Sequence, residues 1–257
     1  MQDLKRSDRS DQTREAAEII RLARRVSVSA GLERSFKIAA GAVDARRFLI
    51  SMAPRPGFRD ALHEGLKALC FPISLRPALE EGLKRSRFLH LGYAQKAGRQ
   101  VCKLYCEASP TEGARVKIYL GFKWRLGDPD EFAIDEYWRL DGLDETGLRA
   151  QIAQTLEPGG ALSDAVGIVL DRALARVPVS DLFFQEVLRG GVRRSVDMRL
   201  YDAGLILDDV KDVAGAAATA LGAGRIDEIF AEHGGESLGH VSAGPGFITF
   251  YHGAGDL

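Results

Sequence analysis

The stretch Arg115-Val116-Lys117-Ile118-Tyr119 decides the fold, because charged or phenolic side chains alternate in it with aliphatic ones. Successive side chains of a β-strand point to opposite faces, so the two cations and the tyrosine are predicted to share one face. The same alternation puts Lys103 with Tyr105 on an earlier strand, and Arg199 with Tyr201 on a later one. Three strands are therefore expected to carry cations and phenols on one face and aliphatics on the other.

Two architectures fit these two-faced strands. An open sheet with one wet face gives such a pattern and suits a protein-interaction surface. A closed barrel gives it as well, with the apolar face under helices and the polar face around an anionic ligand. Because several cations gathered in an interior are costly without a partner of opposite charge, the barrel interpretation implies an anion.

Composition limits the function classes. The chain has 257 residues, 46% hydrophobic and 28% charged, with a net charge of -1. These values are typical of a globular protein and argue against broad affinity for nucleic acid or acidic membranes. The three cysteines, Cys70, Cys102 and Cys106, indicate no disulfide framework and show no metal-ligand spacing.

Residues 1–12 are polar and are predicted to form a disordered tail before a single domain over 13–257. The tail lacks the apolar core of a signal peptide, and no apolar stretch is long enough to span a bilayer. The cytoplasm is therefore the expected location.

Hairpin and helix signals alternate along the chain. Turn residues separate paired strand patterns over 32–52, 88–107, 115–140, 181–202 and 237–251, and helical spacing recurs over 13–26, 58–86, 143–176 and 207–233. Five hairpins give ten strands, and closure into a barrel removes their bare edges. The expected fold class is α+β, a ten-stranded antiparallel barrel surrounded by helices.

Five hairpins interleaved with helix pairs, carrying Lys-x-Tyr on successive strands, resemble the aromatic prenyltransferase superfamily. The stretch His90-Leu91-Gly92-Tyr93 ahead of Cys102-Lys103-Leu104-Tyr105 is most similar to the cyanobactin-type peptide prenyltransferases. The resemblance covers about residues 30–252. One departure is that residues 108–114 leave room for a loop only, where relatives carry a helix pair.

The resemblance implies a role for ten residues. A base on the first strand corresponds to Glu33. The diphosphate ligands correspond to Arg47, Lys103, Arg115, Lys117 and Arg199, and the tyrosines that shield the carbocation correspond to Tyr105, Tyr119, Tyr201 and Tyr251.

The implied activity is transfer of a dimethylallyl or geranyl group from its diphosphate to an aromatic, guanidine or imidazole nucleophile. The acceptor is a peptide or an aromatic small molecule, and a peptide acceptor indicates a role in peptide modification. The co-substrate is the allylic diphosphate; magnesium dependence, acceptor and oligomeric state stay open. The alternative function is a non-catalytic barrel that binds an anionic phosphorylated molecule.

Asp208-Asp209-Val210-Lys211-Asp212 spells the acidic motif of isoprenyl diphosphate synthases, but a second acidic motif is missing from the sequence. Acids also suit the start of a helix, where they accept from free backbone N–H groups. We therefore expect Asp208 and Asp209 to cap a helix, and we assign no metal ligand. The five histidines are scattered, and none is interpreted as a ligand.

Overall fold

The computed structural model describes residues 14–96, 99–108, 113 and 115–257. The predicted disordered tail over residues 1–12 lies outside the described residues.

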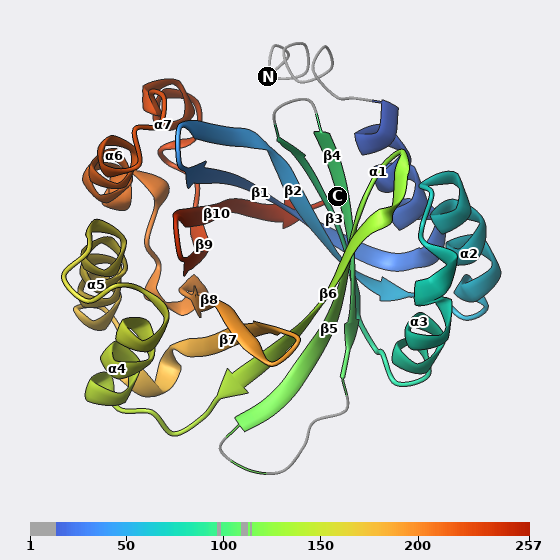
Figure 1. Cartoon of the computed structure of the whole chain (residues 1–257), viewed down its shortest axis with the longest axis horizontal. Helices are drawn as coiled ribbons and strands as arrows, with labels where there is room; N and C mark the ends of the chain where they lie inside the picture. Colours follow the sequence, from blue (N-terminus) through green and yellow to red (C-terminus); the bar gives the residue numbers. More distant parts are fainter. Residues whose placement is uncertain (1–13, 97–98, 109–112, 114) are drawn as a thin grey trace.

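Ten antiparallel strands close into a barrel in the order β1-β10-β9-β8-β7-β6-β5-β4-β3-β2 (Figure 1). The strands are β1 Ser27–Ala39, β2 Ala42–Pro54, β3 Leu89–Lys96, β4 Arg99–Glu107, β5 Arg115–Arg125, β6 Asp128–Leu140, β7 Phe183–Arg189, β8 Val192–Arg199, β9 Leu238–Gly244 and β10 Phe247–Asp256. The ring is complete because β10 pairs with β1, for example through Phe250 opposite Phe36. The predicted fold class is confirmed, and the open-sheet interpretation is wrong.

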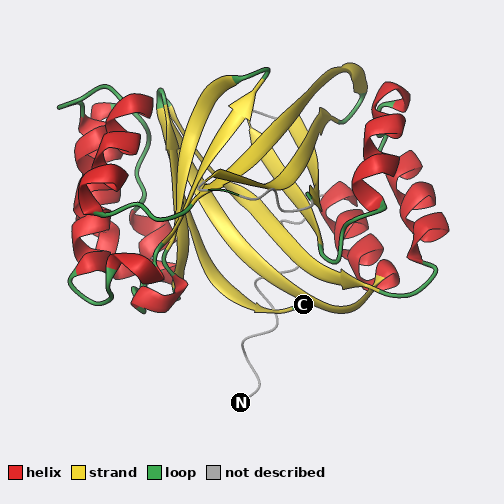
Figure 2. Cartoon of the chain, turned by 90° about the horizontal axis from the view of Figure 1, so that it is seen from below, coloured by secondary structure: helices red, strands yellow, loops and turns green. Residues whose placement is uncertain are grey.

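Helices pack around the outside of this barrel in two groups on opposite sides (Figure 2). One group holds α1 Arg14–Val26, α2 Phe58–Ala68 and α3 Arg76–Leu83, and the other holds α4 Glu145–Thr155, α5 Ala161–Leu174, α6 Lys211–Ala220 and α7 Asp227–His233. As predicted, helix pairs lie between β2 and β3, between β6 and β7, and between β8 and β9. Among the described residues, no helix is long and apolar enough to cross a membrane.

The hydrophobic core lies between the outer face of the barrel and the helices. Phe36 is fully buried, stacks on Phe250 with ring centroids 5.1 Å apart, and meets the edge of Phe230 at 5.8 Å. On the other side Trp124 is buried and donates its indole N–H to the carbonyl of Leu69 at 2.8 Å. Each such side chain contributes about 1.5–3 kcal/mol by leaving water, so the apolar strand faces hold the helices in place.

Strand β5 breaks the expected alternation at Ile118. Lys117 pairs with Trp138 of β6, but Tyr119 pairs with Tyr137, so Ile118 is one extra residue on its strand. Because a bulge adds one residue, side chains before it point to the face opposite to the one that unbroken alternation predicts. Tyr119 lines the barrel interior, whereas Lys117 forms an ion pair with Glu136 outside the cavity.

Arg115 follows Lys117 to the outer face. Its Nε lies 2.5 Å from Oε1 of Glu186, which also binds Arg193, and Arg193 in turn reaches the carbonyl of Gln151 on α4. Arg115 and Lys117 also sit over the ring of Trp138, at 4.4 and 4.8 Å from its centroid. The prediction that Arg115, Lys117 and Tyr119 share one face is therefore wrong, because pairing with β6 inserts the bulge.

Candidate functional site

The topology gives the barrel two different ends. The described hairpin turns lie at one end, and the helical connections lie at the other, because the chain runs up and down through consecutive hairpins. We call these the hairpin end and the helix end. The distance of a residue from its hairpin turn thus tells where along the barrel its side chain lies.

A cavity of about 430 Å³ occupies the barrel interior. Its size is within the range typical of small-molecule sites, roughly 300–1,000 Å³. The residues that line it include cations, carboxylates, two histidines and five tyrosines: Lys37, Arg47, Lys103, Lys123, Arg189, Arg199, Glu33, Asp44, Asp197, His90, His240, Tyr105, Tyr119, Tyr137, Tyr201 and Tyr251.

Cations gather near the hairpin end. This cationic cluster consists of Lys37, Arg47, Lys103, Lys123 and Arg189, and the acids beside it are Asp44 and Asp135. Asp135 forms ion pairs with two of the cations. Lys123 Nζ lies 2.5 Å from Asp135 Oδ2, and Arg189 Nε donates to Asp135 Oδ1 at 2.6 Å. Within the described part of the chain, five cations thus stand beside two carboxylates, so the positive charges outnumber the negative ones.

Two members of the cationic cluster lack a partner of opposite charge within the described part of the chain. Lys103 makes no ion pair there, and burial together with Arg47 and Lys123 holds its pKa well below the usual range. Arg47 has a buried Nε without a hydrogen-bond partner. Gly92 makes room for the lysine, since a Cβ there would lie 3.3 Å from its Cβ. An anion at this place would satisfy both side chains.

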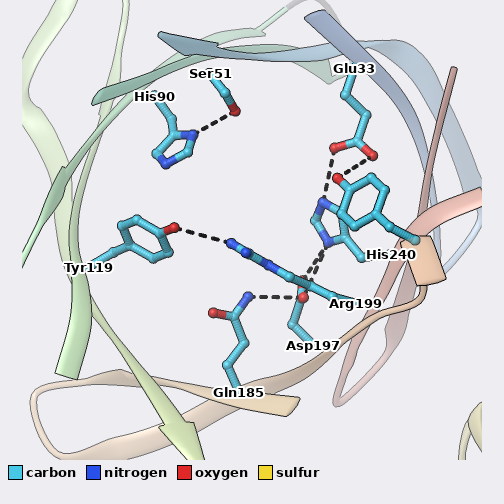
Figure 3. A network of polar contacts seen from close by, with 9 residues as sticks. Glu33, Ser51, His90, Tyr119, Gln185, Asp197, Arg199 and His240 are labelled. Atoms are coloured by element: carbon cyan, nitrogen blue, oxygen red, sulfur yellow. Dashed lines mark hydrogen bonds and ion pairs between the residues drawn. The ribbon is translucent and has the colours of Figure 1, made fainter. Parts of the chain in front are cut away.

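A hydrogen-bonded chain of acids and an imidazole occupies the helix end (Figure 3). The hydroxyl of Tyr201 donates to Glu33 Oε1 at 2.9 Å, and His240 Nε2 lies 3.1 Å from the other carboxylate oxygen. His240 Nδ1 lies 3.0 Å from Asp197 Oδ2, and Gln185 donates to Oδ1 of the same aspartate at 2.9 Å. We call Glu33, His240 and Asp197 the acid–histidine chain.

His240 carries a proton at neutral pH. Burial alone disfavours the charged ring, but the carboxylates of Asp197 and Glu33 outweigh it and raise the pKa to about 9. The ring also stacks on Tyr251, with centroids 3.7 Å apart. Two carboxylates around one imidazolium leave this chain with one net negative charge.

His90 has the opposite state. Burial and the nearby Arg199 lower its pKa to about 3, so the ring is neutral. Ser51 Oγ lies 2.7 Å from its Nδ1, and the edge of its ring meets Tyr119 at 5.0 Å. Arg199 reaches across the cavity and donates to the hydroxyl of Tyr119 at 3.2 Å.

Tyrosine rings lie between the two clusters. Tyr251 stacks on His240 and also lies near Arg47. Burial raises the pKa of the Tyr251 phenol, and the positive charge of Arg47 opposes this rise. Tyr105 meets Tyr137 edge to face at 5.4 Å, and burial raises the pKa of both phenols well above the usual value. Gly121 permits this packing, because a Cβ would stand 2.9 Å from one ring and 3.0 Å from the other.

The cavity includes eight of the ten residues that the sequence singled out. They are Glu33, Arg47, Lys103, Tyr105, Tyr119, Arg199, Tyr201 and Tyr251, whereas Arg115 and Lys117 do not line it. Tyr201 lies in a short 3-10 turn, Tyr201–Ala203, rather than on the predicted strand, yet its hydroxyl reaches Glu33.

Sequence reasoning missed several lining residues. Lys123 was detectable, because it continues the inward alternation from Tyr119 through Gly121. Lys37 was detectable in the same way, because alternation along β1 places it on the same strand face as Glu33. His240 carried no local signal, since only closure of the barrel brings it beside Glu33 and Asp197.

The acidic motif lies away from the cavity. Asp209 accepts from the backbone N–H of Ile206 at 2.9 Å and from Arg176, also at 2.9 Å. Asp212 pairs with Arg172 at 2.6 Å. The two acids thus anchor the start of α6 to arginines of the α5 region.

No family model and no curated protein matches this sequence. Solved structures match in fold. PriB, in a binary complex with product diphosphate, is 13% identical with a TM-score of 0.54, over 86% of this chain and 79% of that one. A 6-dimethylallyl tryptophan synthase is 12% identical with the same TM-score, over 86% and 80%.

AnaPT from Neosartorya fischeri gives a third match, 12% identical with a TM-score of 0.54 over 86% of this chain and 77% of that chain. The barrel is that of the aromatic prenyltransferases. The resemblance drawn from the strand pattern is confirmed at the level of the fold.

Proposed function

We propose that the protein is a prenyltransferase that moves a dimethylallyl or geranyl group from its diphosphate to a nucleophile bound at the helix end. The observation that carries the proposal is the polarity of the cavity. Unpartnered buried cations stand at one end, a carboxylate–imidazolium chain stands at the other, and tyrosine rings lie between them.

The donor diphosphate, with about three negative charges at neutral pH, supplies the charge that Lys103 and Arg47 lack. Arginine binds phosphate oxygens as a fork and lysine binds them as a point charge. Lys123 and Lys37 extend the same cluster. Arg199 is the other predicted ligand that lines the cavity. It binds the diphosphate from the opposite side of the cavity after it gives up its hydrogen bond to the hydroxyl of Tyr119.

Cleavage of the donor C–O bond gives diphosphate and an allyl cation. Cationic side chains stabilise the leaving group, which lowers the barrier to ionisation. The rings of Tyr105, Tyr119, Tyr137 and Tyr251 face the cation with their π-electrons and keep water away from it. Burial raises the pKa of Tyr105, Tyr137 and Tyr251, so these three phenols offer O–H donors to the diphosphate without adding negative charge.

Attack by the acceptor forms the new bond to carbon and releases a proton, which Glu33 takes. A general base must lie within hydrogen-bond reach of that proton. Glu33 Oε1 is bonded to Tyr201, which is 47% exposed on a short turn, so an acceptor displaces this phenol more easily than the buried His240. The acceptor thus sits at the position of the Tyr201 hydroxyl.

The finer proposal concerns the acceptor. Two similar structures are described as complexes with L-tryptophan and with brevianamide F, each with a dimethylallyl thiolodiphosphate. Similarity of the strand motifs to cyanobactin-type enzymes favours a side chain within a peptide, with an aromatic, guanidine or imidazole nucleophile. Peptide modification of this kind is the role that we propose first.

The test is a turnover assay with purified protein, dimethylallyl or geranyl diphosphate and a panel of aromatic small molecules and short peptides. Mass spectrometry detects the added prenyl group, with and without Mg²⁺. We expect product with the wild type and with Lys117→Met, and at least tenfold less with Lys103→Met. Donor binding without product on any acceptor would favour the non-catalytic barrel, and absence of donor binding would overturn the prenyl-transfer function.

A further inference from the structure

A second cluster of chemically active side chains lies outside the barrel, away from the cavity. His233 is the last residue of α7, Glu236 lies in the turn that follows, and His252 points outward from β10. One ligand atom from each of these residues lies within 4.8 Å of the others. Segments that are distant in sequence thus bring two imidazoles and one carboxylate together.

The distances between these atoms suit a shared ion. His233 Nδ1 lies 3.1 Å from Glu236 Oε1, and His252 Nδ1 lies 2.8 Å from Oε2. Bonds of about 2.0–2.2 Å to a metal place neighbouring ligand atoms about 3.3 Å apart in a tetrahedral site. Small rotations of the three side chains are enough to turn the present hydrogen bonds into metal bonds.

The backbone holds the carboxylate in this position. Glu236 N donates to the carbonyl of His233 at 2.9 Å, and Gly253 N donates to the carbonyl of Ser237 at 3.0 Å. Gly253 has a φ of 65°, and a Cβ on it would lie 2.0 Å from Glu236 Oε2. The glycine therefore gives Glu236 the space to approach His252, and the cluster is built before any ion arrives.

Burial and charge also fit a cation. The side chain of His252 is 3% exposed, whereas those of His233 and Glu236 are 21% and 29% exposed and give an ion access from solvent. Glu232 lies 3.7 Å from His233 Nε2 and adds a second negative charge. Arg34 lies 3.8 Å from Glu236, and its positive charge opposes a cation.

We propose that His233, Glu236 and His252 bind a divalent transition metal such as Zn²⁺, with water completing the coordination. Two imidazoles and one carboxylate are ligands that Zn²⁺ and its neighbours prefer over Mg²⁺ or Ca²⁺. The ion would tie the end of α7 to β10. It therefore stabilises the folded protein by an amount that grows with the logarithm of the metal concentration above the dissociation constant, and it takes no part in the chemistry of the cavity.

The experiment uses the full chain without an affinity tag, freed of metal by a chelator. Co²⁺ is titrated while the visible absorption is followed, and Zn²⁺ is titrated by calorimetry. We expect one site, with the d–d bands of a low-coordinate Co²⁺, and a higher melting temperature with Zn²⁺. His233→Gln and Glu236→Gln should each weaken Zn²⁺ binding at least tenfold.

His63→Gln is the matched control, because His63 also pairs with a glutamate, Glu80, at 2.9 Å on the far group of helices. It should bind Zn²⁺ like the wild type. Saturation absent at about 100 μM Zn²⁺, or equal affinity in His233→Gln and His63→Gln, would overturn the proposal. Both variants change partly exposed side chains, so circular dichroism can confirm that each is folded before titration.

Discussion

The hairpin end and the helix end of the cavity differ in how far their polar groups are satisfied. At the helix end Glu33, His240 and Asp197 bond to one another, and Tyr201 and Gln185 complete the chain. At the hairpin end Lys103 and Arg47 have no such partners among the described residues. The polar groups at one end are satisfied without a ligand, and the proposed function assigns an anion to the other.

Because of this difference, we expect the hairpin end to determine the affinity for the donor and the helix end to determine the rate of the reaction. A buried cation without a partner costs free energy, and a ligand that removes the cost binds more tightly. A base, in contrast, must be oriented before the reaction begins, which the hydrogen bonds of the acid–histidine chain achieve. Variants at the two ends should therefore change different measured quantities.

The largest effect is expected at the helix end. Glu33→Gln keeps the size of the side chain but cannot take the acceptor proton, so turnover should fall by roughly 10²–10⁴-fold. Affinity for the donor should stay within about twofold, because the proposed function places the donor diphosphate at the other end. Single-turnover kinetics and calorimetry measure the two quantities separately. Full turnover in this variant would remove Glu33 from the mechanism.

The next effect concerns the pH dependence of stability. His240 has a folded pKa of about 9, raised above the ordinary 6.5 by the carboxylates that outweigh its burial. The folded protein therefore holds a proton that the unfolded chain releases, and the stabilisation is complete below about pH 6.5 and lost as the pH rises through 9. Its upper limit is on the order of a few kcal/mol.

Urea unfolding of the wild type and of His240→Gln at several pH values measures this contribution as the difference between two curves. The difference is needed because Lys103, whose pKa is lowered, makes stability rise with pH in both proteins. The free energy of unfolding of the wild type should decline relative to the variant between pH 6.5 and 9. Parallel curves would mean that His240 is not protonated in the fold.

The smallest effects separate a lysine inside the barrel, Lys103 on β4, from a lysine outside the cavity, Lys117 on β5. Without donor, Lys103→Met should leave the free energy of unfolding unchanged or raise it by about 1 kcal/mol, because a buried unpaired ammonium is lost. Lys117→Met should lower it by at most about 1 kcal/mol, since the Lys117–Glu136 pair is partly exposed. A loss above about 2 kcal/mol in Lys103→Met would show that the lysine is already satisfied.

The fold was predictable because its signals are local. Alternating faces, such as Lys103 and Tyr105 against Cys102 and Leu104, and glycines in the turns gave the hairpins, and closure follows from the need to pair every edge. Strand bounds were less certain, as the turn at Tyr201 shows.

The wrong placement of Lys117 and the omission of His240 from the predicted site have the same cause. Lys117 was assigned to the interior because alternation was assumed to run unbroken, whereas the bulge at Ile118 arises from pairing with β6. His240 was passed over because its partners, Glu33 and Asp197, are far away in sequence. Both depend on contacts between strands, which a single strand pattern does not contain.

The central claim is that the hairpin end holds a diphosphate, and calorimetry with dimethylallyl thiolodiphosphate tests it most directly. We predict that the wild type binds the compound, because the diphosphate supplies the opposite charge that Lys103 lacks. Lys103→Met should bind about 10–100-fold more weakly, and Lys117→Met should match the wild type. Equal affinity in Lys103→Met and the wild type would contradict the account.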